Sequence, residues 1–267
     1  MTLYTISDST GETAAKIAAA AMSFFPKVGD KTKHRVFVTD LEKAKAVLAK
    51  IASDPGPVIV TMADDELRDW IIEGVQKLGL PVTTPVAPVV EMLEDYFGQP
   101  ARARPGGQYH VDDLYFRRVD AIDFAISQDD GAGRLAAADV ILTGVSRTSK
   151  TPTCIYLACR GIRAANIPLV PGISPSVALF EAAEKGVPIV GLTASPNRLA
   201  QIRGARLESI GEDRTADYAA LDQIRSEVAE ARLLFERLSA SVIDVTRRSI
   251  EETAAAITAL LEERARP

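Results

Sequence analysis

The sequence predicts an α/β protein with two domains, each built on a parallel sheet that helices cover. Short apolar segments alternate with longer helical patterns along nearly the whole chain, and this alternation favours parallel strands joined by helices. The pattern breaks once, in "GQPARARPGGQYHVDD", where proline, glycine and arginine replace the apolar period. We therefore expect an N-terminal α/β domain at residues 1–97, a linker or mobile loop at 98–113 and a second α/β domain at 114–267.

The first domain begins with a strand and an alanine-rich helix. Its strands are expected at 2–7, 34–40 and 56–62. Its helices are expected at 12–25, at 64–79, where Gly79 marks the end, and after the three prolines of 80–98. In the turn "SDSTGET" (7–13), Ser9 or Thr10 is expected to cap the first helix, with Glu12 as the capping-box acid. The alternative is that this turn grips a phosphate or a partner protein at the helix N-terminus.

The second domain opens with a helix at 114–127 and then alternates again. Its strands are expected at 138–144, 167–171, 187–193 and 241–246. Its further helices are expected near 152–162, 175–185, 195–204, 216–239 and 248–264.

Composition narrows the class of protein. The formal net charge is −5 over 267 residues, which disfavours a general nucleic-acid binder because such proteins need a basic face. The two cysteines, Cys154 and Cys159, are expected to be small core residues and not a disulfide or zinc site. With only two histidines, a multi-histidine metal site is excluded. No signal peptide or membrane span is evident, so a cytoplasmic protein is expected.

The stretch "GVSRTSKT" after the strand at 138–144 resembles a phosphate-binding loop. The pattern G-x-x-x-x-G-K-[ST] predicts such a loop when a strand precedes it and a helix follows. Here the candidate nucleotide-binding residues are Gly144, Val145, Ser146, Arg147, Thr148, Ser149, Lys150 and Thr151. We therefore predict a P-loop kinase-like α/β domain for nucleotide binding and phosphotransfer. The pattern taken alone leaves an ordinary basic strand–turn–helix equally open.

Each position of this loop has an expected role. Backbone N–H groups and the helix N-terminus attract phosphate, Lys150 reaches the outer phosphates, and the Thr151 hydroxyl binds Mg²⁺. Ser149 stands where the pattern has its second glycine, and we expect it to fit by keeping a negative φ. Arg147 adds a planar cationic donor.

Five blocks, in order and spread over most of the chain, connect it to one known family. They are "YTISDSTGETA", "YFRRVDAIDFAISQDDG", "ADVILTGVSRTSKTPTCIYLACRGIRAANIPLVP", "VGLTASPNRLAQIR" and "VIDVTRRSIEETAAAI". They resemble the regulatory proteins of pyruvate, phosphate dikinase and phosphoenolpyruvate synthase. The resemblance implies a bifunctional enzyme that phosphorylates a threonine of the dikinase with ADP and removes that phosphate with inorganic phosphate, releasing pyrophosphate. The "RTSKT" loop is more similar to the dikinase-directed branch, since the synthase-directed branch more often has glycine at position 149. The family suggests a homodimer.

Other residues are candidates for the rest of the chemistry. Asp129 and Asp130, at a helix end before the loop's strand, are candidates for the catalytic base or a Mg²⁺ ligand, beside Lys150 and Arg147 as catalytic cations. An acidic helix-to-turn junction is the structural alternative. By similarity to small P-loop kinases, Thr246 and Arg247 would border the adenine.

Further cations and one further acid complete the set of candidates. Arg198 is a candidate phosphate contact because it follows a strand end. Asp244 is not expected to act as a Walker B acid, because its strand is the last one and not evidently beside the loop's strand. A basic island would meet a protein substrate, phosphate or pyrophosphate, and comprises Arg102, Arg104, Arg117 and Arg118. For Arg117 and Arg118, a solvated charged helix face is an equally good explanation.

The leading hypothesis is therefore a protein-threonine phosphotransferase acting on the dikinase, with ADP, inorganic phosphate and Mg²⁺ as its small molecules, and with no nucleic-acid or membrane partner. The alternatives are the same chemistry on phosphoenolpyruvate synthase, a small-molecule P-loop kinase, and a non-catalytic nucleotide sensor.

Overall fold

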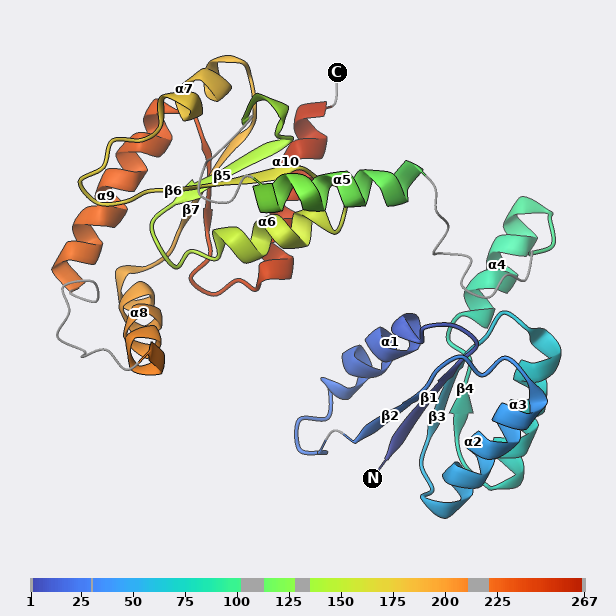
Figure 1. Ribbon diagram of the computed structural model, residues 1–267. Helices are drawn as coiled ribbons and strands as arrows, with labels where there is room; N and C mark the ends of the chain where they lie inside the picture. Colours follow the sequence, from blue (N-terminus) through green and yellow to red (C-terminus); the bar gives the residue numbers. More distant parts are fainter. Residues whose placement is uncertain (1, 30, 102–112, 128–134, 211–220, 266–267) are drawn as a thin grey trace. The chain divides into compact units, whose positions relative to one another are not determined.

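The computed structural model describes residues 2–29, 31–101, 113–127, 135–210 and 221–265. The chain divides into two compact units, Met1–His110 and Val111–Pro267. Each unit contains one four-stranded parallel sheet (Figure 1), which confirms the predicted fold class. No helix in these ranges is long and apolar enough to cross a membrane.

The first unit has the strand order β2-β1-β3-β4. The strands are β1 (Leu3–Ser7), β2 (Thr32–Arg35), β3 (Val58–Thr61) and β4 (Val82–Thr83). The helices are α1 (Glu12–Met22), α2 (Leu41–Ser53), α3 (Asp65–Lys77) and α4 (Ala87–Phe97).

Alternate strand residues of the first unit face opposite layers. Tyr4, Ile6 and Val60 pack against α2 and α3. Ile59, which points the other way, packs against the alanines of α1. Figure 1 shows α1 on one side of this sheet and α2 and α3 on the other.

The predicted strand at 34–40 is wrong beyond Arg35. Phe37 adopts a left-handed conformation with φ of 54°, so the chain leaves the sheet there. The N–H group of Phe37 instead donates to the carbonyl of Ser9, in the loop that follows β1, and that of Val38 donates to the carbonyl of Ser7, the last residue of β1. The backbone of the apolar run at 36–38 therefore fixes the start of that loop.

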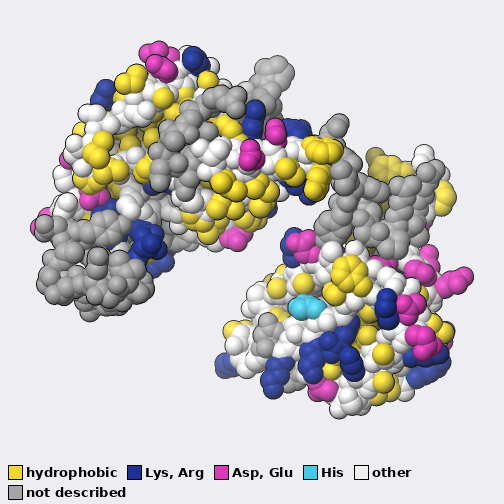
Figure 2. All heavy atoms as spheres, in the orientation of Figure 1, with side chains coloured by type: hydrophobic (Ala, Val, Ile, Leu, Met, Phe, Trp, Pro, Cys, Tyr) yellow, Lys and Arg dark blue, Asp and Glu magenta, His cyan; other side chains and the backbone are white. Residues whose placement is uncertain are grey.

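The edge strand β2 is basic. Lys33, His34 and Arg35 follow one another along it, and Figure 2 shows dark blue side chains gathered beside the cyan histidine on this unit. Lysine on an edge strand discourages pairing with another chain, so this basic edge has a structural explanation.

The second unit has the strand order β6-β5-β7-β8. The strands are β5 (Val140–Gly144), β6 (Ala164–Pro168), β7 (Ile189–Thr193) and β8 (Ser241–Asp244). The helices are α5 (Asp113–Ser127), α6 (Lys150–Ala158), α7 (Val177–Glu184), α8 (Pro196–Ile210), α9 (Leu221–Arg237) and α10 (Ile250–Ala265), with a short 3₁₀ turn at Leu135–Ala137.

The second sheet is buried on both faces. One apolar cluster joins Ile141 and Ile167 to α7 and α9, and another joins Leu142 and Leu192 to α6 and α10. The strand predicted at 167–171 lies at 164–168 instead, because its register is set by β5, whose last residue Gly144 pairs with Pro168.

The expectation that both cysteines lie in the core is half wrong. Cys154 is buried, but Cys159 is exposed. α6 ends at Ala158 and Cys159 is its C-cap residue, which places the second thiol at the helix end and outside the core.

Both sheets share one connectivity. The first strand of each unit is central, the second strand lies on one side of it and the third on the other. A crevice for a ligand forms at such a reversal of strand order, at the carboxyl ends of the strands. The two loops at these reversals follow β1 and β5.

Candidate phosphate-binding site

The loop after β5 is closed on itself by short hydrogen bonds. Its first residue, Gly144, has φ of 151°, and a Cβ there would lie 2.3 Å from the carbonyl oxygen of Leu192, so only glycine fits. The carbonyl of Val145 accepts from the Thr148 hydroxyl over 3.0 Å and from Lys150 Nζ over 2.9 Å. The Val145 carbonyl therefore draws Thr148 and Lys150 together in one turn that Gly144 begins.

Ser149 does not keep the negative φ that we expected. Its φ is 60° and its ψ is 26°, and Arg147 has φ of 73°. A left-handed conformation costs a residue with a Cβ about 1–2 kcal/mol, which explains why the pattern has glycine at position 149. Left-handed residues in a loop turn successive N–H groups to one side and form an anion-binding concavity, so the strain is consistent with phosphate binding.

The start of α6 is open to an anion. Ser149 is the N-cap residue, and its side chain makes no capping bond within the part of the chain described. The first N–H groups of a helix and its positive dipole end attract negative charge. The helix start would therefore stabilise a phosphate at this position.

Lys150 is buried, with only 6 % of its surface exposed. A buried ammonium needs polar partners and a counter-charge, and the Val145 carbonyl supplies one partner. Arg147, two loop positions away from Ser149, has its Nε atom buried and without a hydrogen-bond partner among the described residues. An anion in the loop would give Arg147 Nε a hydrogen-bond partner.

Thr151 is held by a residue that the sequence analysis missed. Asn166, on the neighbouring strand β6, donates from Nδ2 to the Thr151 hydroxyl oxygen over 3.0 Å. Among the described residues no group of three or more histidine, cysteine or acidic side chains is placed to hold a metal. The oxygen of Thr151 suits Mg²⁺, which is usually bound by few protein ligands together with phosphate and water.

A buried ion pair that the sequence analysis also missed is hydrogen-bonded to the loop. Arg203 of α8 is 0 % exposed and pairs with Glu227 of α9 over 2.6 Å. Its Nη2 also donates to the carbonyl of Ser146 over 3.3 Å. In the sequence, Arg203 stands among other polar residues of its helix, and nothing there indicates that its side chain is buried. This contact could therefore be found only in the fold.

The segment after β8 lies against the end of β7. The Val245 N–H donates to the Thr193 carbonyl over 2.8 Å, and the Thr246 hydroxyl accepts from the Ser195 N–H over 2.8 Å. Thr246 is thus held at the end of β7, the strand that neighbours β5. Arg247 next to it is exposed.

Asp244 shapes the same turn. Its carboxylate accepts from the Thr246 N–H over 2.8 Å. Burial raises the pKa of Asp244, but the hydrogen bonds from Thr246 and the nearby arginines, Arg232 and Arg248, outweigh it and leave that pKa below its ordinary value. β7 separates β8 from β5, so Asp244 does not occupy the position of a Walker B acid.

The remaining candidates are not joined to this loop by the described contacts. Arg198 is exposed in the first turn of α8, where its N–H donates to the Ser195 hydroxyl. Arg117 and Arg118 are exposed on α5. Four candidates lie outside the described residues: Arg102, Arg104, Asp129 and Asp130.

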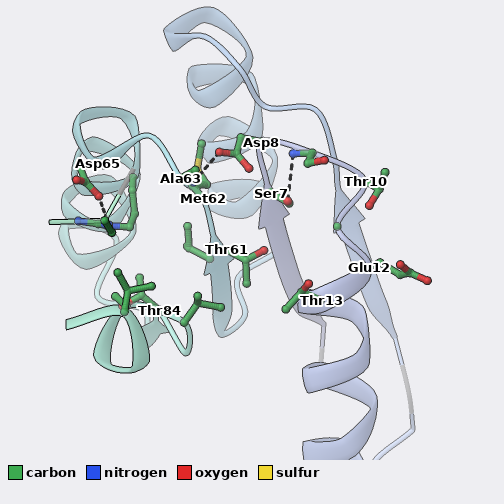
Figure 3. A pocket seen from close by; sticks show the side chains of 18 of the residues that line it. Ser7, Asp8, Thr10, Glu12, Thr13, Thr61, Met62, Ala63, Asp65 and Thr84 are labelled. Carbon is green, nitrogen blue, oxygen red and sulfur yellow. Dashed lines mark hydrogen bonds and ion pairs between the residues drawn. The ribbon is translucent and has the colours of Figure 1, made fainter. Parts of the chain in front are cut away.

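The loop after β1 borders a cavity of about 460 Å³, shown in Figure 3 with Ser7, Asp8 and Thr13 on one side and Met62 and Ala63 on the other. Asp8 ties the two sides together, because its carboxylate accepts from the Ala63 N–H over 2.6 Å. The lining is acidic: Arg68 is paired with Asp65, and the other charged lining residues are Asp8, Glu12, Glu91 and Glu94.

The expected cap of α1 by Ser9 or Thr10 is wrong. The N-cap residue is Gly11, which has φ of 75° and no side chain that could cap the helix. A Cβ at Gly11 would lie 2.7 Å from Cγ1 of Val36. The chain therefore enters α1 through a glycine, as a phosphate loop often does, but into acidic surroundings.

Comparison with known proteins identifies the family of this chain. The family described as Kinase/pyrophosphorylase matches residues 3–258. A protein of Caulobacter vibrioides, provisionally named pyruvate, phosphate dikinase regulatory protein, is 47 % identical over 97 % of this chain and 82 % of its own length. Proteins with the same provisional name from Sphingopyxis alaskensis and Rhodospirillum rubrum are 43 % and 41 % identical, over 98 % and 96 % of this chain and 97 % and 93 % of their own lengths. The chain belongs to the kinase/pyrophosphorylase family.

Proposed function

We propose that this chain transfers the β-phosphoryl group of ADP to a threonine hydroxyl of pyruvate, phosphate dikinase and so inactivates it. In this step the threonine oxygen forms a bond to phosphorus, the bond to the α-phosphate oxygen breaks, and AMP leaves. In the reverse regulation, inorganic phosphate attacks the phosphothreonine, which regenerates the hydroxyl and yields pyrophosphate. Family membership implies an enzyme that uses nucleotide and phosphate.

One observation carries this proposal: the closed loop at 144–151, with buried Lys150 at the open start of α6. A phosphoryl group gains most from fixed positive groups placed around its oxygens. Lys150 and Arg147 supply charge, and the loop N–H groups supply directed donors. The names of the relatives supply the target.

The other groups take their roles around this loop. Thr151, steadied by Asn166, would hold Mg²⁺, which offsets phosphate charge when bound. Thr246 and Arg247 would border the adenine, and Asp129 or Asp130 would accept the proton of the threonine. The functional domains would be residues 1–97 and 114–267, joined by 98–113.

We further propose a homodimer that meets its target in the cytoplasm. Several large apolar side chains of α4 and α5 are exposed in the described chain, and exposed apolar patches mark association surfaces. Those on α4 include Met92 and Tyr96, and those on α5 include Leu114 and Phe116. Sedimentation equilibrium would give the mass of the assembly.

The test is to incubate the chain with phosphohistidine dikinase and ADP and to map the phosphosite by mass spectrometry. Phosphothreonine and AMP in equal amounts support the proposal. A preference for ATP with no transfer to the dikinase would falsify it. Transfer to phosphoenolpyruvate synthase instead would identify the other branch. Transfer to a small molecule, or ADP binding without any transfer, would identify the small-molecule kinase or the sensor.

A further inference from the structure

A second cavity, of about 400 Å³, opens directly beside the phosphate loop. The segment that follows β6 forms one wall and α9 forms the other. This segment starts at the loop, because the Leu169 N–H donates to the carbonyl of Gly144 over 3.1 Å. Val145 of the loop also lines the cavity. Its volume and its place at the carboxyl end of the sheet are those of a ligand site.

The mouth of this groove is apolar and exposed. Ile173, on the segment after β6, is 67 % exposed, and Leu233, on α9, is 62 % exposed. Below them, Leu234 and Ala231 are buried. Exposed apolar side chains on both walls of one groove favour an apolar occupant.

The segment wall is conformationally restricted. Pro171 and Pro175 fix two of its φ angles, and the Ile173 N–H closes a turn on the Val170 carbonyl over 3.1 Å. A wall that is already ordered loses little entropy when it binds. The groove therefore retains more of its contact free energy as affinity for an occupant.

The charges of the groove do not suit a second phosphate. Glu230 is exposed on α9, Arg237 lies over the ring of Phe180 at the far end, and Glu227 is paired with Arg203. Beside the loop, the exposed charge of the described lining is thus the Glu230 carboxylate, because Arg203 neutralises Glu227. A neutral or basic polypeptide fits these surroundings better than a nucleotide does.

We propose that this groove binds the segment of the protein substrate that carries the acceptor hydroxyl, with an apolar side chain of that segment between Ile173 and Leu233. This inference rests on the proposed function and adds the place where the acceptor lies. The acceptor oxygen must reach a phosphoryl group on the loop, and the groove starts at the first two loop residues. An occupant would also touch Glu227, the partner of the arginine that holds the Ser146 carbonyl.

The test compares the double variant Ile173→Ser, Leu233→Ser with the wild type in steady-state transfer from ADP to the dikinase. Both positions are exposed, so the variant is expected to fold. We expect the KM for the dikinase to rise at least tenfold, while kcat and the KM for ADP stay within twofold. Val177→Ser is the matched control, because Val177 is 71 % exposed on α7 but does not line the groove. It is expected to behave as the wild type.

Hydrogen exchange supplies a readout that does not depend on turnover. Amides of residues 169–175 and of α9 are expected to exchange more slowly when the intact dikinase is added to wild-type protein, and to show no such slowing in the double variant. An unchanged KM for the dikinase in the double variant overturns the groove but leaves the proposed function standing. A wild-type chain that transfers nothing to the dikinase overturns both.

Discussion

The loops after β1 and β5 are a pair with the same position and different surroundings. Each follows the central strand of a sheet with the same strand order, and each enters its helix through a left-handed residue, Gly11 or Ser149. The loop after β5 holds a buried lysine and a partly buried arginine. The loop after β1 holds Asp8, bonded across to Ala63, and its cavity is lined by further carboxylates.

This difference shows that topology provides a crevice and side chains decide what it can bind. A helix start favours anions, but carboxylates beside it raise the energy of a bound phosphate by like-charge repulsion. We therefore propose that phosphate binds at the loop after β5 alone. The following predictions test this assignment, from the largest expected effect to the smallest.

The largest effect is expected from the ion pair below the loop after β5. Arg203→Met leaves Glu227 buried and unpaired, and this type of loss costs about 3–5 kcal/mol. Urea unfolding would measure the free energy. The control, Arg225→Ala, removes an exposed pair with Asp222 on the same helix and should cost less than about 1 kcal/mol. Equal losses in the two variants would contradict a supporting role for Arg203.

Lys150→Ala is expected to lower both the ADP-dependent transfer and the phosphate-dependent removal by about 100-fold or more, because one fixed donor to a developing charge is worth about that much. Initial rates with dikinase and with phosphodikinase would measure it. Lys185→Ala changes an exposed lysine of the same unit and should leave both rates unaltered. If either activity survives in Lys150→Ala, the two directions use separate sites.

A reciprocal exchange tests the two left-handed residues. Gly11→Ser should destabilise the protein by about 1–3 kcal/mol, because its Cβ meets Val36. Ser149→Gly should stabilise it by about 0.5–1 kcal/mol, since relief of the strained φ exceeds the added chain entropy. ADP affinity should stay within about threefold, since the backbone already has the conformation that glycine adopts. A tenfold loss of affinity would instead identify the Ser149 hydroxyl as a ligand.

The smallest effect concerns acid stability of the first unit. Hydrogen bonds from Lys33 and Thr2 lower the pKa of Asp54 to about 2, with burial opposing them and Tyr4 adding to them. This pKa lies below the unfolded value of about 3.9. The interactions of ionised Asp54 therefore add to the free energy of unfolding above about pH 4, and this stabilisation is lost as the pH falls from about 4 to about 2. Asp54→Asn should flatten the dependence of the urea midpoint on pH in that window. An unchanged slope would show that other carboxylates dominate.

Much of this architecture is predictable from local patterns. The alternation of apolar runs predicts the parallel sheets, and the spacing of Gly144, Lys150 and Thr151 predicts the loop, because these depend on neighbours in the chain. The exit of β2 at Arg35 depends on bonds from Phe37 to a distant loop. Asn166 and Arg203 reach the loop from other elements, and only the packed fold brings them there.

The most direct test of the assignment is calorimetric titration of ADP and of pyrophosphate into wild-type protein and Lys150→Ala. We predict one ADP site per chain, competition between ADP and pyrophosphate, and loss of binding of both ligands in the variant. Pyrophosphate binding that persists at wild-type affinity in Lys150→Ala would place phosphate elsewhere, with the start of α1 as the first place to look, and would contradict the assignment.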